Sequence, residues 1–465
     1  MAATGDREPG ENEGSDAGLV ESARRGTGPR CEGPPSGDPL SGARLAIRAE
    51  PCVAVDPLAV FAAAAGESRF YWEQPAAGCF RVGVGCARRL AVSGAGRFRA
   101  AEAGARDLFE RIDWEGPGPR VGHLVGGFAF APSRAMGDLW RGFTDGALVL
   151  PELTYWSDDG RCVRAACVGS RWAGVRPRPL AIGQPVRGVV EIGNGGPEPY
   201  ETRVRGILDE IRANRLQKVV LSRAVHVTAG STIDAVAWLV ALRERFPSCT
   251  LFAVGEGDAV FLGATPERLV RVRGDSVETA ALAGTAPRGA SRAADQALGV
   301  ALCDSLKNGA EHAVVVRFLC EALAECCDDV AVAPEPVLLK TRTVQHLCTP
   351  LSARRRAAAE PSLLELVERL HPTPAVGGAP REDALRWLSE HEGIERGWFA
   401  SPVGFLRSDG DGEFAVALRS ALVRGRTATA WAGAGIVARS EPRAEFTETE
   451  LKLRTVLGPL LWGAP

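Results

Sequence analysis

Lysine is rare in this chain, and its few copies lie among residues that could carry chemistry. The sequence has 55 basic residues, of which four are lysine: Lys218, Lys307, Lys340 and Lys452. An arginine cannot lose its proton in a protein, whereas a lysine can do so and act as a base. We therefore expect some of these lysines to do what arginine cannot do, with chance placement as the alternative.

A lysine and a carboxyl could form an acid–base couple. Lys218 opens the run QKVVLSRAVHV, in which strand alternation places Lys218, Val220 and Ser222 on one face. Glu267 lies in GATPERL, where Pro266 fixes the backbone and gives the carboxyl a defined direction. The plain alternatives are a solvated lysine on an edge strand and an acid in a loop or in the first turn of a helix.

Three further carboxylates lie on predicted helices beside the remaining lysines. Glu311 follows Lys307 by four residues, a spacing that usually gives a surface ion pair. Glu445, Glu448 and Lys452 share one helical face. Two carboxylates and a lysine could hold a hard cation and an anionic substrate. The same pattern is also typical of a solvated charged face, so spacing alone leaves both interpretations open.

Glycine- and threonine-rich segments are predicted to be loops between elements: GTAPRG, HPTPAVGG and GAGIVA. Their backbone could approach an anion closely, as could that of any tight turn. His346, in TVQHL, is more typical of a hydrogen-bonded core histidine than of a catalyst.

Composition narrows the class of protein. The chain has 465 residues, 45% of them apolar, and a formal net charge of −2. A net charge near zero does not indicate the basic surface that nucleic-acid binding needs. No apolar run reaches the length of about 20 residues that a membrane span needs. The beginning of the chain lacks the features of a secretory signal. The twelve cysteines lie mostly singly in apolar stretches, which predicts reduced core residues in a cytoplasmic protein.

These residues need a large scaffold to bring them together. Residues 1–45 are rich in Gly, Pro and charge and are predicted to be disordered. Residues 46–195 read as short strands of an antiparallel sheet, forming the N-terminal β-rich portion of the fold. Residues 196–465 mix strands with helices predicted near 200–214, 232–245, 294–326, 362–370, 381–390 and 441–457. The expected class is α+β, with large, mainly antiparallel sheets packed as a sandwich and helices outside them.

Taken in order, ten segments resemble the chorismate-utilising enzymes, a family that includes isochorismate, salicylate, anthranilate and aminodeoxychorismate synthases. The resemblance covers about residues 200–457 and is carried by QKVVLSR, GATPERL, ALAGTAPRG, LKNGAEHAVVV, KTRTVQHL, LHPTPAVGG, RGWFASPVGF, EFAVALRSALV, GAGIVARS and EFTETELKLRTVL. It implies a deep, Mg²⁺-dependent site for a dianionic cyclohexadiene.

The resemblance also implies roles for single residues. Lys218 would be the base that activates water, and Glu267 the acid that protonates the departing hydroxyl. Glu311 and Glu448 would bind Mg²⁺, with Glu445 close to the metal. The implied substrate-binding residues are Gly284, Thr285, His346, Thr373, Arg419, Gly433, Gly435 and Lys452.

Within the family, the sequence is most similar to the isochorismate synthases. Aminodeoxychorismate synthases commonly carry a lysine nucleophile where this chain has Ala283, and ALAGT is the form seen in isochorismate synthases. Phe399, Ser401 and Asn308 depart from common family residues, which bears on the fine shape of the site and not on the class of enzyme. The expected protein is a monomer that acts on chorismate without an obligatory glutaminase subunit. A salicylate synthase is the alternative, followed by an anthranilate synthase component.

Overall fold

The computed structural model describes residues 44–132, 136–175, 177, 179–180, 183–186, 190–193, 196–356 and 360–461. The extension predicted to be disordered therefore lies outside the described residues, except for its last two. Leu45 already belongs to the first strand. None of the helices in this described part is long and apolar enough to cross a membrane.

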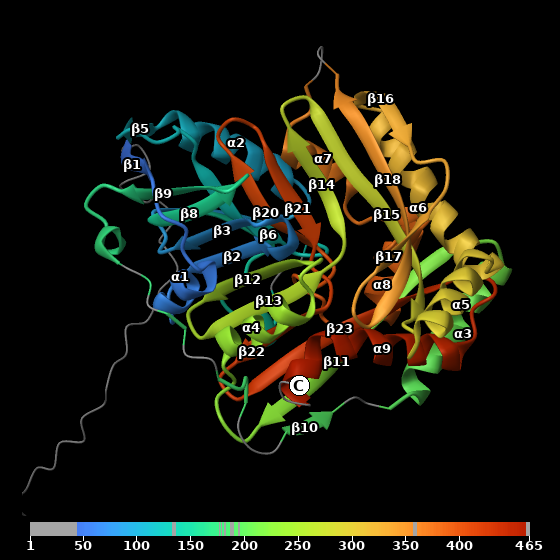
Figure 1. Ribbon diagram of the computed structural model, residues 1–465. Coiled ribbons are helices and arrows are strands. Elements are labelled where there is room, and N and C mark those ends of the chain that lie inside the picture. The colour runs from blue at the N-terminus through green and yellow to red at the C-terminus, as the bar shows by residue number, and fades with distance from the viewer. Residues whose placement is uncertain are drawn as a thin grey trace, which may run out of the picture. The chain divides into compact units, whose positions relative to one another are not determined.

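Within these described residues, one sheet has 13 strands, drawn from both the N-terminal and the C-terminal parts of the sequence (Figure 1). β19 (Gly378–Ala379) pairs with β11 off the main path. The order along that path is β10 (Val190–Gly193), β11 (Lys218–Ala229), β23 (Thr427–Ile436), β22 (Ser420–Arg424), β13 (Ala259–Thr265), β12 (Thr250–Glu256), β2 (Arg69–Gln74), β3 (Cys79–Val84), β8 (Leu153–Asp158), β9 (Arg161–Cys167), β1 (Leu45–Pro51) and β5 (Ile112–Glu115).

The second sheet has ten strands. β17 (Val337–Lys340) pairs with β18 off its main path. The order is β16 (Cys327–Val332), β18 (Val344–Arg355), β15 (Ser276–Pro287), β14 (Arg268–Arg273), β21 (Gly412–Val416), β20 (Pro402–Arg407), β6 (His123–Phe128), β7 (Gly146–Leu150) and β4 (Arg88–Val92). The described strand pairs are antiparallel except for β1 with β5, and strands of both sheets contribute to one apolar core. The predicted α+β class is confirmed.

Helices pack against both sheets (Figure 1). Short 3₁₀ turns lie at Pro75–Ala77, Asp138–Trp140 and Arg171–Gly174. The α-helices are α1 (Pro57–Ala63), α2 (Arg97–Glu110), α3 (Glu198–Arg212), α4 (Ala235–Arg245), α5 (Arg292–Cys303), α6 (Leu306–Ala324), α7 (Leu363–Leu370), α8 (Arg381–His391) and α9 (Pro442–Leu461).

Two expectations about these elements were wrong, and two helices were missed. Residues 46–195 contain α1 and α2 in addition to their strands, and α2 buries Phe98, Ala101, Ala105 and Leu108 at helical spacing. The helix predicted over 294–326 is two helices, because Ser305 ends the connection and caps α6 by accepting the Asn308 N–H. The segments GTAPRG and GAGIVA are largely strand rather than loop, since β15 extends to Pro287 and β23 to Ile436.

The cysteine prediction holds only in part. The eleven described cysteines are free thiols, but Cys86 and Cys303 are exposed rather than in the core. Cys86 follows the end of β3, and Cys303 is the last residue of α5. Both occupy ends of elements, where the chain turns towards the surface.

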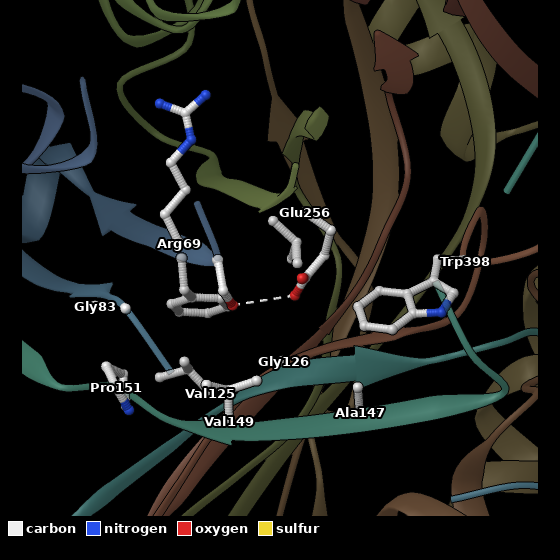
Figure 2. A pocket seen from close by; sticks show the side chains of 13 residues that line it. Arg69, Gly83, Val125, Gly126, Ala147, Val149, Pro151, Glu256 and Trp398 are labelled. Carbon is white, nitrogen blue, oxygen red and sulfur yellow. Dashed lines mark hydrogen bonds between the residues drawn. The ribbon is translucent and has the colours of Figure 1, made fainter. Parts of the chain in front are cut away.

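A small cavity of about 20 Å³ lies between the two sheets (Figure 2). Val125, Gly126, Ala147 and Val149 of the second sheet line one side of it (Figure 2). On the side of the 13-stranded sheet, the Ser68 hydroxyl donates a hydrogen bond to Glu256 at 3.2 Å. The volume suits a single water molecule. None of the residues predicted to act on substrate lines this space, so it is not the candidate site.

Candidate active site

A buried ion pair joins β11 to α6. Lys218 has no exposed surface, and its Nζ lies 3.0 Å from Oε1 of Glu311. Apart from this ion pair, Nζ has no hydrogen-bond partner among the described residues. Lys218 is therefore not the solvated edge-strand lysine of the plain alternative. A buried pair of this kind holds both groups in place, because an unpaired charge there would be strongly unfavourable.

Glycine makes room for this pair. Gly435 on β23 lies opposite Val220 of β11. A Cβ at Gly435 would approach Oε1 of Glu311 to 2.1 Å and Cε of Lys218 to 3.0 Å. The glycine predicted to contact substrate thus also gives Lys218 and Glu311 the space in which they meet.

A second pair joins α6 to α9. Lys307 Nζ lies 2.6 Å from Oε1 of Glu445. Glu445 is buried, with 1% of its surface exposed. The spacing of Lys307 and Glu311 suggested a surface pair within one helix. The structure instead pairs each of them with a different element. Sequence reasoning missed Lys307 because a four-residue spacing on a helix gives no sign of a partner more than 130 positions away.

A third pair lies within α9. Lys452 Nζ is 2.7 Å from Oε1 of Glu448 and donates a hydrogen bond to the Gly433 carbonyl at 2.9 Å. Burial alone would raise the pKa of Glu448, but Lys452, Lys307 and Arg419 bring it below its ordinary value. For Glu445, burial and the neighbouring Glu448 charge raise the pKa, against the opposing effects of Lys307 and Ser440. The solvated-face alternative does not describe this side of α9.

The three carboxylates offer oxygen donors that suit a hard divalent cation. Glu445 Oε2 is buried and makes no hydrogen bond to any described residue, so it is available for a cation. Within the described part of the chain, however, no three Asp, Glu, His or Cys side chains are already grouped as a metal site. One oxygen of each carboxylate contacts a lysine, and a cation would have to compete with these ammonium groups.

Glu267 occupies the turn between β13 and β14. Its N–H donates to the Thr265 hydroxyl at 3.2 Å, and its carbonyl accepts the Val416 N–H at 3.0 Å. The residue is 6% exposed. Burial raises the pKa of Glu267 to about 7, although the positive charges of Lys218, Arg419 and Lys452 act against the rise. The site thus contains a carboxyl that can carry a proton near neutral pH.

Arg419 and His346 form a hydrogen-bonded unit behind this carboxyl. Arg419 Nη2 donates to His346 Nε2 at 3.2 Å. Since a guanidinium can only donate, Nε2 must accept and Nδ1 must carry the ring proton. Nδ1 then donates to the Gly284 carbonyl at 3.2 Å, with the Thr285 hydroxyl 3.1 Å away. Burial and the nearby Arg419 charge hold the pKa of His346 well below its ordinary value, so the imidazole is neutral.

Gly284 lies where β15 changes register against β18, between Ala283 and Thr285. Its φ of +80° is in the region that favours glycine. The bulge turns the Gly284 carbonyl to His346, which links the GTAPRG segment to Arg419. The bulge at Gly284 therefore orients the neutral His346, and His346 in turn orients the Arg419 guanidinium.

A buried arginine–glutamate pair that sequence reasoning missed supports the remaining predicted residue, Thr373. Arg396 and Glu392 pair at 2.6 Å with both side chains 4% exposed. Arg396 donates to the carbonyls of Val220 at 2.7 Å and Val376 at 2.8 Å. The buried Thr373 belongs to the same loop as Val376, whose N–H bonds to the Thr373 carbonyl. Only the four-residue spacing of Glu392 and Arg396 could have suggested this pair.

Two spaces give access to these groups. A cavity of about 40 Å³ is lined by Ser222, Arg419, Gly433, Lys452 and Phe399, among others. A wider cleft of about 740 Å³ has Cys249, Thr265, Pro266 and Cys348 in its lining. Thr265 and Pro266 directly precede Glu267. The cleft therefore reaches the turn that carries the candidate acid, and the smaller cavity contains the candidate anion-binding cations.

Comparison with known proteins identifies the family of the chain. The family model described as chorismate binding enzyme matches residues 40–171 and 184–461. The chain belongs to the chorismate-binding enzymes. The match includes the N-terminal β-rich portion, where the sequence motifs were weakest.

Individual relatives agree with this membership. The chain is 38% identical over 422 residues to the salicylate biosynthesis isochorismate synthase of Pseudomonas aeruginosa, covering 86% of each. It is 32% identical over 434 residues to the isochorismate synthase MenF of Bacillus subtilis, covering 87% of this chain and 91% of the relative. The solved structure of MenF, the menaquinone-specific isochorismate synthase from Escherichia coli, has a TM-score of 0.75 at 28% identity, covering 90% and 97% of the two chains.

The Gly435→Ala variant should lose turnover by on the order of 10²-fold while remaining folded, because the added methyl must displace Glu311 or Lys218. Gly309→Ala on α6 is the matched control, since a Cβ there meets nothing within 4 Å. The measurements are steady-state rate and melting temperature for both variants. A Gly435→Ala enzyme with the wild-type rate would show that the Lys218–Glu311 geometry is not needed.

Proposed function

We propose that this chorismate-binding enzyme is an isochorismate synthase, which isomerises chorismate by adding water at C2 and losing the C4 hydroxyl. The observation that carries the proposal is that one buried site holds both a potential base, Lys218, and a potential acid, Glu267. Lys218 is fully enclosed, and Glu267, with a pKa near 7, lies within its electrostatic influence. The names of the full-length relatives support the same reaction.

Lys218 takes the proton of the water that attacks C2. As the ion-pair partner of Glu311, it can be neutral only where another positive charge balances that carboxylate. Water is the nucleophile because Ala283, buried in β15 beside Gly284, offers no amine.

Glu267 protonates the C4 hydroxyl as it leaves, which a carboxyl with a pKa near 7 can do at neutral pH. Arg419, held by the neutral His346, binds a carboxylate of the substrate together with the backbone of Gly433 and Gly435. Gly284 and Thr285 contact the ring carboxylate, and Thr373 lies against the ring. These contacts follow from the family resemblance, and the shared cavity lining of Arg419, Gly433 and Lys452 supports them.

Mg²⁺ is part of the proposal. Glu311 and Glu448 would hold it, with Glu445 beside them, and the bound cation would offset the charge of the substrate carboxylates. Lys452 and Lys307 would balance the remaining negative charge from their positions beside Glu448 and Glu445. The free Oε2 of Glu445 supports a cation at this place.

Cytoplasmic location, a monomeric state and independence from a glutaminase complete the proposal. The placement of most cysteines singly in apolar stretches of the sequence supports a reducing compartment. Gel filtration with light scattering tests whether the protein is a monomer. Product analysis with added ammonium tests whether it uses ammonia, as an enzyme with a glutaminase subunit would.

Product analysis tests the reaction. The protein is incubated with chorismate and Mg²⁺, with and without ammonium, and the products are separated by chromatography. Isochorismate alone is the expected product in both reactions. Salicylate would identify the alternative in which pyruvate is eliminated at the same site. Fluorescent anthranilate that increases with ammonium would contradict the choice of water as nucleophile.

The pH dependence of turnover should report Glu267. The acid works only when protonated, so kcat/KM should fall as pH rises through about 7, where the carboxyl loses its proton. Profiles of kcat/KM for the wild type and Glu267→Gln check this. The variant should be slow throughout and lack the falling limb. A falling limb that persists in the Gln variant would assign it to another group.

A further inference from the structure

Two cysteines far apart in the sequence meet at one end of the 13-stranded sheet. Cys52 directly follows β1, and Cys162 lies in β9. The two strands pair antiparallel with Pro51 opposite Val163, which brings the cysteines opposite each other. The Cys52 N–H donates to the Cys162 carbonyl at 3.0 Å, and the two Sγ atoms lie 3.2 Å apart.

This geometry suits a covalent bond between the sulfurs. Directly opposed residues of a hydrogen-bonded antiparallel pair have Cα atoms about 5.5 Å apart, which is within the range that disulfides span. A closing movement of about 1 Å between the sulfurs would form the bond. By contrast, Cys326 and Cys327 have sulfurs 3.9 Å apart, but as sequence neighbours their Cα atoms are too close for an ordinary disulfide.

We propose that Cys52 and Cys162 are a redox-modification site that forms a reversible disulfide with a low-molecular-weight disulfide as oxidant. Cys52 is partly exposed and Cys162 is buried, so Cys52 meets the oxidant first. Its thiolate attacks one sulfur of the oxidant, giving a mixed disulfide and one released thiol. Cys162 then attacks the Cys52 sulfur and expels the second thiol. Two electrons pass from the cysteines to the oxidant, and both thiol protons end on the released thiols.

The surroundings set the rate and the consequence of this reaction. Burial and the adjacent Cys162 raise the pKa of Cys52 to about 12, so little thiolate exists at neutral pH and the crosslink should form faster as pH rises. The bond would close a loop across 110 positions and fasten β1 to β9. A constraint of this length should stabilise the fold. Seven strands separate β9 from β11 in the sheet, so turnover should not change.

Peptide mapping tests the site. Full-length protein is treated with oxidised glutathione at mildly alkaline pH, alkylated with N-ethylmaleimide and digested with trypsin without reduction. We expect the peptide of residues 49–69 to be linked to that of residues 162–164, with the link lost on adding dithiothreitol. Cys86→Ser, which removes an exposed cysteine elsewhere, should leave the link intact, and Cys52→Ser should abolish it.

Melting temperature supplies a second measurement. The oxidised wild type should melt several degrees higher than the reduced form, whereas Cys52→Ser should show no such difference. Cys52 recovered only as a glutathione or maleimide adduct would overturn the proposal. So would a crosslinked form that melts no higher than the reduced protein.

Discussion

The Lys218→Arg enzyme should convert chorismate roughly 10²–10⁴ times more slowly than the wild type, which is the contribution of a general base. Arginine keeps the positive charge and can still pair with Glu311, but it cannot give up its proton. If Lys218 only balanced Glu311, the substitution would preserve most of the activity. Steady-state turnover and calorimetric binding of chorismate to the slow variant are the measurements.

The shape of the site requires two controls for this experiment. Lys218 is fully enclosed and close to Gly435, so the bulk of arginine could disturb the site for steric reasons alone. Lys218→Met, which is not bulkier than lysine, should be equally slow. Lys340→Arg makes the same exchange at a partly exposed lysine paired with Asp295 at 2.9 Å and should keep the wild-type rate. A Lys218→Arg enzyme within about tenfold of wild type would remove Lys218 from the mechanism.

Glu311→Gln and Glu448→Gln should each reduce Mg²⁺-dependent turnover by more than about 10²-fold, because a catalytic cation contributes several kcal/mol. Glutamine keeps the shape of the side chain but removes the negative charge that holds a hard cation. The measurements are rate as a function of Mg²⁺ concentration and binding of Mn²⁺ without substrate, followed by electron paramagnetic resonance.

Glu450→Gln is the matched control on the same helix. Glu450 pairs with Arg223 rather than with a lysine of the site, so this variant should keep both its rate and its Mn²⁺ affinity. A Glu311 or Glu448 variant that retains a near-normal rate and Mg²⁺ response would show that the residue does not bind the cation.

The local part of the site could be predicted from the sequence. The alternation in QKVVLSR correctly placed Lys218 at the start of a strand, and Pro266 correctly marked the turn that carries Glu267. These features depend on neighbouring residues, whose conformational preferences act over a few positions. The helical face of Glu445, Glu448 and Lys452 was predictable for the same reason.

The partners of these residues could not be predicted. Lys307 and Glu311 have the spacing of a surface ion pair within one helix. In the structure, however, Lys307 forms an ion pair with Glu445, and Glu311 forms one with Lys218. These choices depend on where the fold places α6 relative to β11 and α9, which no short segment encodes. The Arg396–Glu392 pair and the bulge at Gly284 are likewise products of tertiary contacts. The family resemblance supplied the roles, but the contacts that hold each group in place had to come from the structure.

The pairing of β11 with β23 has a consequence for biosynthesis. β11 ends at Ala229, whereas its neighbour β23 begins at Thr427, so the ribosome must add nearly two hundred residues before β11 gains this partner. Contacts so distant in sequence form late and slowly. A nascent chain that already carries Lys218 and Glu267 still lacks α9, and with it Glu445, Glu448 and Lys452. Competence to bind a charged metabolite should therefore arise only when α9 docks, as one of the final events of folding.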